Sequence, residues 1–283
     1  MSNRINETIN KAKSENRLAF IGLLPIMPES LEKTMEIADM IIKSGVDIAM
    51  VHIPNWFPWM EGGTLQVAAR RPRNAGVKRE DIFRFIKKLR EKYPDLPILD
   101  MTLYDTALTM GQDNFIKLSQ NADVDGYDLP DYPLFQSNDK FGFHKWCIEN
   151  NRHLILDVSY EEATSSPNTI EYELLDETCI NARGFVFVMN APGGKSGSSV
   201  KLTNEELKKA VSNVKAKLIE KENLDTSVSV VCGISDAKDL EKVKESGAES
   251  FMIGSAYIKM ILEGKSLKEV SEYISNISKM CHY

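Results

Sequence analysis

The sequence predicts an α/β fold: a single (β/α)8 (TIM) barrel domain over residues 1–283, with an extra helix at its N-terminus. Short apolar runs alternate with amphipathic helical stretches along the whole chain, and no Ser/Gly/Pro-rich linker interrupts them. Glycine-containing turns end the last two apolar runs, where barrels of this class bind phosphate. Together these observations favour one closed parallel barrel.

Eight apolar runs have the length and composition of buried strands. The predicted strands are 19–24, 47–53, 98–103, 125–129, 153–158, 184–189, 228–232 and 250–253. Helical patterns separate them, and residues 1–16 form a further polar helix before the first strand. Thr203 with Glu206 and Ser266 with Glu269 have the spacing of capping boxes that open helices.

A doubly wound open sheet is the alternative fold. Its glycine-rich fingerprint should follow the first strand, but residues 24–28 contain no glycine. The barrel is therefore the better prediction.

The composition limits the class of function. The chain has 283 residues, 42% of them hydrophobic, and a net charge of −6, which does not favour nucleic acid or an anionic membrane as a partner. No apolar stretch has the length of a signal peptide or a membrane span. The four cysteines are scattered without CxxC spacing, so we expect free thiols and a cytoplasmic protein.

Two turns predict a phosphate site. The seventh strand ends in Cys232-Gly233-Ile234-Ser235, and the eighth ends in Gly254-Ser255-Ala256. Glycine allows a phosphate to approach the backbone, and amides at a helix N-terminus supply donors. We therefore predict phosphate contacts at Gly233, Gly254 and Ser255. The alternative is that both glycines serve only as turns.

Several stretches agree in order and spacing with one known family. They are Ile53-Pro54, Glu61-Gly62-Gly63-Thr64-Leu65-Gln66, Ala75-Gly76-Val77, Val124-Asp125, Asp131-Tyr132-Pro133 and the two turns just named. Over nearly its whole length the chain resembles the tryptophan synthase α-subunit family. The resemblance implies a barrel that cleaves indole-3-glycerol phosphate to indole and glyceraldehyde 3-phosphate, beside a pyridoxal-phosphate β subunit.

The resemblance also reveals a departure at the catalytic centre. The family uses a glutamate on the second strand and an aspartate in the following loop, and these positions hold Met50 and Glu61 here. Methionine cannot transfer a proton, and loss of a positioned acid/base group costs about 10²–10⁴-fold in rate. Glu61 keeps a carboxylate in the loop and is the predicted main acid/base.

Alternation along the strands predicts which side chains face the barrel interior. Residues that share the parity of Met50 include His52 on the second strand, Asp100, Thr102 and Tyr104 on the third, Asp128 on the fourth and Asp157 on the fifth. We predict catalytic roles for Glu61, Asp128, Asp100 and Tyr104, and a substrate pocket lined by Met50, His52, Asp157 and Phe187. The resemblance implies mainly apolar residues at the three aspartate positions, suited to a flat indole.

Unpaired buried carboxylates need a cation, a proton or hydrogen-bond donors. One explanation is a divalent metal, with His52, Asp128 and Asp157 as ligands. A second is a cationic or polyhydroxylated substrate. A third is that one or more of the aspartates face outward or accept backbone hydrogen bonds.

Two long loops follow the second and sixth strands. Residues 54–63 contain Trp56 and Trp59, which predict either a protein-partner surface or a lid; packing against neighbouring helices is the alternative. Residues 190–202 are glycine-rich, and the resemblance places here a mobile loop that folds over substrate. We add Gly197 in this loop to the predicted phosphate contacts.

The sequence thus predicts a lyase or retro-aldolase that acts on a small phosphorylated substrate other than indole-3-glycerol phosphate. A non-catalytic barrel that binds a phosphorylated ligand or regulates a partner is the second hypothesis. Ordinary cleavage of indole-3-glycerol phosphate, with Glu61 replacing the missing glutamate, is the third.

Overall fold

The computed structural model describes residues 3–57, 59, 61–134, 139–194 and 200–283. Eight parallel strands close into a barrel in sequence order, and β1 is hydrogen-bonded to both β2 and β8. The strands are β1 (Ala19–Leu24), β2 (Ile48–His52), β3 (Ile98–Met101), β4 (Gly126–Asp128), β5 (His153–Val158), β6 (Phe185–Met189), β7 (Ser227–Val231) and β8 (Ser250–Ile253). Each lies at a predicted position, so the barrel prediction is confirmed.

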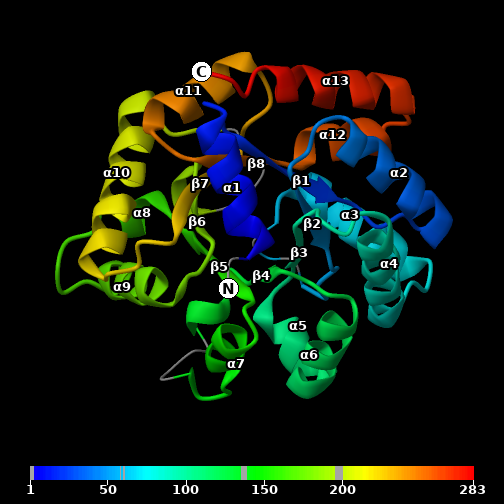
Figure 1. Cartoon of the computed structure of the whole chain (residues 1–283), viewed down its shortest axis with the longest axis horizontal. Helices are drawn as coiled ribbons and strands as arrows, with labels where there is room; N and C mark the ends of the chain where they lie inside the picture. The colour runs from blue at the N-terminus through cyan, green and yellow to red at the C-terminus, as the bar shows by residue number, and fades with distance from the viewer. Residues whose placement is uncertain (1–2, 58, 60, 135–138, 195–199) are drawn as a thin grey trace.

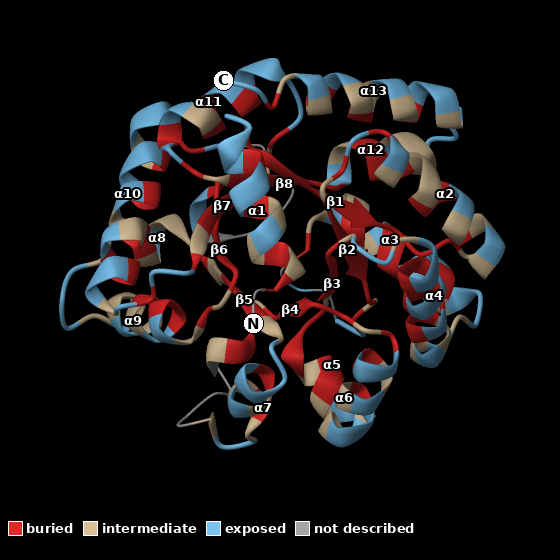
Figure 2. Cartoon of the chain, viewed as in Figure 1, coloured by how far each residue is buried: buried red, intermediate tan, exposed pale blue. Residues whose placement is uncertain are grey.

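Helices surround the barrel, with buried inner faces and exposed outer faces (Figure 2). They are α1 (Arg4–Ser14), α2 (Leu31–Lys43), α3 (Gly63–Asn74), α4 (Arg79–Lys92), α5 (Tyr104–Met110), α6 (Gln112–Asn121), α7 (Phe143–Glu149), α8 (Tyr160–Ala163), α9 (Ile170–Asn181), α10 (Asn204–Glu220), α11 (Ala237–Ser246), α12 (Ser255–Leu262) and α13 (Leu267–Lys279), with short 3-10 turns at Tyr132–Leu134 and Pro192–Gly194. Both predicted capping boxes form, at the starts of α10 and α13. None of the described helices is both long and apolar enough to span a membrane.

The extra N-terminal helix α1 lies across the amino end of the barrel (Figure 1). Its buried residues Ile5 and Ile9 join the core, and Arg4 forms a 2.7 Å ion pair with Asp125, just before β4. Asp125 also accepts hydrogen bonds from Arg90 of α4 at 2.5 Å and from the Ile98 amide at 2.8 Å. Because α1 covers this end, a ligand reaches the barrel from the carboxyl ends of the strands.

Strand register corrects two of the predicted catalytic residues. Met50 pairs with Leu99, while Asp100 pairs with Val51 on one side and Tyr127 on the other. Since paired residues of neighbouring strands face the same side, Leu99 points inward with Met50 and Asp100 points outward. The Tyr127 ring packs against aromatic residues of α6 and α7, which lie outside the barrel.

The inward placement of Asp100 and Tyr104 was therefore wrong. Tyr104 is buried at the start of α5, where its ring packs against Tyr132 and Phe143 and its hydroxyl bonds Gln112. Asp100 is fully buried between the sheet and the helices, and neither carboxyl oxygen has a hydrogen-bond partner. Burial raises the pKa of the Asp100 carboxyl well above its usual value, so the group is neutral in the folded protein.

We expect Asp100→Asn to remove a pH-dependent loss of stability. The folded pKa is raised, so this group's contribution to stability is full below the unfolded pKa of about 4 and is lost as the pH rises toward the folded pKa. An amide cannot ionise in either state. Thermal unfolding between pH 4 and 8 should show the variant gaining on the wild type as pH rises. The exposed Asp113→Asn is the control, and an unchanged pH profile for Asp100→Asn would contradict the assignment.

Candidate functional site

A cavity opens at the carboxyl ends of the strands. Its walls come from six of the strands and the loops that follow them, together with the first turn of α3. The lining residues are Asn55, Glu61, Leu65, Met101, Thr102, Leu103, Asp128, Pro130, Asp157, Phe187, Met189, Val231, Cys232 and Met252. Of the predicted site residues, the fold thus brings Glu61, Asp128, Asp157 and Phe187 together here.

Glu61 is held at the cavity wall by a buried hydrogen bond. Its Oε1 lies 2.8 Å from His52 Nε2 at the end of β2, and Asn55 Nδ2 donates to the same oxygen at 3.5 Å. Gln66 Nε2 donates to the Glu61 carbonyl at 2.8 Å, which fixes the backbone at the start of α3. Glu61 is only 8% exposed, and its Oε2 has no hydrogen-bond partner among the residues that the structure describes. One carboxylate oxygen is therefore anchored while the other is available to a substrate.

Met50 and His52 do not line the cavity themselves. Met50 is fully buried and pairs with Leu23 and Leu99, two residue pairs closer to the amino end than the cavity-lining Met101. His52 contacts the cavity through Glu61. The second strand thus places the apolar side chain of Met50 in the barrel interior, while Glu61 of the following loop lines the cavity.

Asp128 and Asp157 enter the cavity from adjacent strands. Asp128 ends β4 and is 4% exposed, and Asp157 lies near the end of β5. The Oδ1 atom of each is buried without a hydrogen-bond partner. Burial, followed by the charge of Asp157, raises the pKa of Asp128 well above its usual value. Burial, followed by the charge of Glu162, raises the pKa of Asp157 to about 7.

The predicted metal set is not assembled. His52 Nε2 is occupied by Glu61, and no three His, Cys, Asp or Glu side chains within the described ranges are grouped so that they could hold a metal ion. The two free aspartate oxygens alone make a poor metal site, because divalent ions take more protein ligands than two unless waters complete the shell. The divalent-metal explanation thus finds no support in the geometry.

A second, more open cavity adjoins the first, and Leu65 lines both. It lies between the turns after β7 and β8 and the start of α3, and it is lined by Gly62, Gly63, Thr64, Leu65, Lys201, Gly233, Ile234, Ser235, Ser255, Ala256 and Lys259. Helices α3 and α12 both begin here, so two helix N-termini present amides to the same space. Gly233 has a φ of +68°, in the left-handed region that favours glycine.

The predicted phosphate residues Gly233 and Ser255 lie in this second cavity, and Gly254 precedes Ser255 as the residue that caps α12. A Cβ at Gly254 would lie 2.6 Å from Leu23 Cβ, so the turn packs directly against β1. Gly197 lies outside the described residues. Two lysines that sequence reasoning missed, Lys201 and Lys259, also line this cavity, and the Lys201 ammonium is ion-paired with Asp239 at 2.7 Å.

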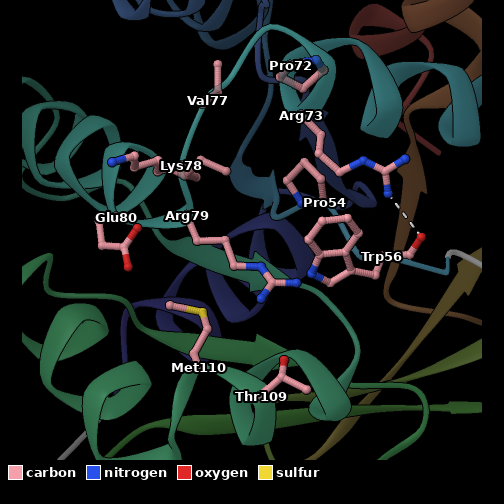
Figure 3. A pocket seen from close by; sticks show the side chains of 11 residues that line it. Pro54, Trp56, Pro72, Arg73, Val77, Lys78, Arg79, Glu80, Thr109 and Met110 are labelled. Atoms are coloured by element: carbon pink, nitrogen blue, oxygen red, sulfur yellow. Dashed lines mark hydrogen bonds between the residues drawn. The ribbon is translucent and has the colours of Figure 1, made fainter.

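The loop after β2 presents three aromatic side chains to solvent. Trp56, Phe57 and Trp59 are 62%, 78% and 54% exposed. Arg73 of α3 lies 5.1 Å from the centre of the Trp56 ring and donates to the Trp56 carbonyl at 3.1 Å. Figure 3 shows Arg79 reaching the other side of this ring, in a groove that Pro54 and Met110 also line. Packing against α3 therefore covers part of the Trp56 side chain, but it does not explain the exposure of Phe57 and Trp59.

Comparisons with known proteins agree with this architecture. The family model described as "Tryptophan synthase alpha chain" matches residues 9–282. The tryptophan synthase alpha chain of Clostridium beijerinckii is 28% identical over 278 residues, covering 98% of each chain. That of Aquifex aeolicus is 25% identical over 276 residues, again covering 98% of each.

Solved structures give the same fold. Tryptophan synthase subunit alpha from Legionella pneumophila superimposes with a TM-score of 0.80 at 21% identity, covering 99% of each chain. A chain of the Mycobacterium tuberculosis tryptophan synthase gives a TM-score of 0.82 at 22% identity, covering 100% of each. At this identity the likeness concerns the fold.

We expect Ser255→Asp to weaken the binding of inorganic phosphate by at least about tenfold, because a carboxylate at this helix N-terminus would occupy the anion position and repel the ligand. Isothermal titration calorimetry would measure the change. Ser266→Asp, the same substitution at the exposed N-cap of α13, is the matched control. Equal phosphate affinity in the two variants would place the phosphate elsewhere.

Proposed function

Because the chain belongs to the tryptophan synthase alpha chain family, we propose that it is a carbon–carbon lyase that cleaves a small phosphorylated substrate by retro-aldol chemistry. The observation that carries the proposal is the free, buried Oε2 of Glu61 in a cavity that adjoins two helix N-termini and two lysines. A phosphate held in the second cavity would place the carbon chain of the substrate beside this oxygen.

Glu61 can move the proton that retro-aldol cleavage requires. Its Oε2 takes the proton from a substrate hydroxyl, the carbon–carbon bond breaks, and the hydroxyl carbon becomes a carbonyl. The electron pair passes into a carbonyl group that the substrate carries next to the leaving carbon. The resulting enolate then takes the proton back from Glu61 on that carbon. The hydrogen bond from His52 keeps the carboxylate in one orientation throughout. Asp128, neutral because burial raises its pKa, assists as a hydrogen-bond donor.

Ordinary cleavage of indole-3-glycerol phosphate is the second candidate, and the full-length family match favours it. Glu61 would then act in place of the missing second-strand glutamate. The buried Asp128 and the half-buried Asp157 argue against it, since the single N–H of an indole ring could serve at most one of the two carboxyl groups. We therefore prefer a different phosphorylated substrate.

Cleavage assays of the purified chain test the proposal. We expect the chain to release a phosphorylated aldehyde from hydroxylated sugar phosphates, and a coupled dehydrogenase would measure this release. We expect little indole from indole-3-glycerol phosphate, with or without a β subunit. Glu61→Gln should lower turnover about 10²–10⁴-fold, because the amide cannot take the proton. Glu272→Gln, the same substitution at an exposed carboxylate of α13, is the control. Undiminished turnover in Glu61→Gln would refute its role, and absence of any turnover would favour a non-catalytic barrel.

We also propose that the exposed aromatic residues after β2 bind a protein partner. Phe57 and Trp59 offer exposed apolar area in the same loop as Trp56, which lines a groove with Arg73 and Arg79, and aromatic and arginine side chains are enriched at binding hot spots. A tryptophan synthase β subunit is the first partner to examine, since the family assembles with one. This segment departs from the usual family sequence, so the complementary surface on the partner must differ too.

The double substitution Phe57→Ser/Trp59→Ser should weaken the complex with the partner at least about tenfold, because each truncated aromatic anchor typically costs more than 1 kcal/mol of binding. Sedimentation velocity of the mixed proteins would measure it. Leu224→Ser removes an equally exposed apolar side chain elsewhere and serves as control. A partner that binds both variants with wild-type affinity would exclude this surface.

A further inference from the structure

Two of the three carboxyl groups in the first cavity have no role in holding it together. Glu61 is bonded to His52 and Asn55, whereas Asp128 and Asp157 each present an unpartnered Oδ1. The lining of this cavity includes no lysine, arginine or histidine, so no described cation there neutralises them. A buried polar atom without a partner is unfavourable, which points to a ligand that supplies the partner.

The two aspartates are placed to act on one group. Asp128 pairs with Ile155 in the barrel register, so Asp157 lies on the neighbouring strand, on the same inward face and two residues closer to the carboxyl end. The electrostatic effect of Asp157 on Asp128 agrees with this proximity. Phe187, which pairs with Asp157, and Met252 form apolar walls. Asp128 and Asp157 therefore form one polar corner of the cavity, bordered by the apolar side chains of Phe187 and Met252.

We infer that Asp128 and Asp157 bind hydroxyl groups of the substrate, and that the substrate is a polyhydroxylated phosphate ester rather than one that carries a flat apolar ring. This inference rests on the proposed lyase function, which supplies the phosphate group of the substrate. It adds the chemical class of the rest of the substrate. It makes the two aspartates the specificity-determining residues of the cavity.

A hydroxyl group fits this pair better than an ammonium group. Burial keeps Asp128 neutral, so its O–H donates, while Asp157 accepts once it is ionised. A hydroxyl both donates and accepts and can satisfy the two aspartates together. An ammonium group only donates, and it would leave the Asp128 proton without an acceptor.

Binding measurements test the inference without depending on catalysis. Calorimetry of the whole chain would compare straight-chain polyol phosphates of about four to six carbons with indolepropanol phosphate, phosphoethanolamine and inorganic phosphate. We expect at least one polyol phosphate to bind about 10²-fold or more tightly than the ring compound, because sites built to hydrogen-bond a hydroxyl reject analogues that lack it. Asp128→Leu/Asp157→Val should remove or reverse this preference.

Binding of inorganic phosphate is the control for folding. Each double variant should bind inorganic phosphate with wild-type affinity if its barrel is intact. The isosteric pair Asp128→Asn/Asp157→Asn separates charge from shape and should lower polyol affinity by about tenfold or more. The inference is overturned if the wild type prefers the ring compound or phosphoethanolamine, if no polyol phosphate binds better than inorganic phosphate, or if neither double variant changes the preference. Tight binding of a polyol phosphate, with no cleavage of the aldose and ketose phosphates of the same chain length, would instead refute the lyase proposal and leave this inference standing.

Discussion

Closure of the parallel barrel is the constraint on which the rest of the molecule depends. Because β1 is bonded to both β2 and β8, the hydrogen-bond register of every strand is fixed relative to its neighbours. The register decides which side chain of each strand enters the interior and at which level. With α1 across the amino end, the same closure leaves the carboxyl ends as the place where loops and strand termini meet a ligand.

At that end the chemistry is divided between two cavities that share Leu65. One presents helix N-termini and lysines, which suit an anion. The other presents carboxyl groups in a mostly apolar lining. In the proposed reaction Met50 cannot transfer a proton and Glu61 does so, and the position of Glu61 depends on its hydrogen bond to His52 at the end of β2. A loop carboxylate anchored by a strand residue is a reasonable substitute for a carboxylate on the strand itself, since the anchor removes much of the loop's freedom.

Sequence patterns predicted the eight strands and the two glycine turns, because each depends on local spacing or on the order of elements. They failed at Tyr104 because β3 ends at Met101 and Tyr104 begins α5, and at Asp100 because parity within a strand says nothing about its offset from the next one. That offset is a property of the closed sheet, and an error of one residue reverses every side chain. Lys201 and Lys259 were missed for a similar reason, since their approach to the phosphate turns depends on how the segments before α10 and within α12 lie over the barrel.

The same register separates two kinds of unpartnered acid. Asp100 faces the helices, lines neither cavity and stays protonated. Its burial therefore lowers the stability of the fold without placing a functional group in the site. Asp128 and Asp157 bear a similar cost, but their free oxygens open onto the space where a substrate would lie. Strain or unsatisfied polarity at a ligand cavity is the pattern expected where function opposes stability. Buried carboxyl groups on the adjacent strands β3 and β4 thus differ in their relation to function: that of Asp100 is remote from both cavities, and that of Asp128 lines one. The direction in which each side chain points distinguishes them.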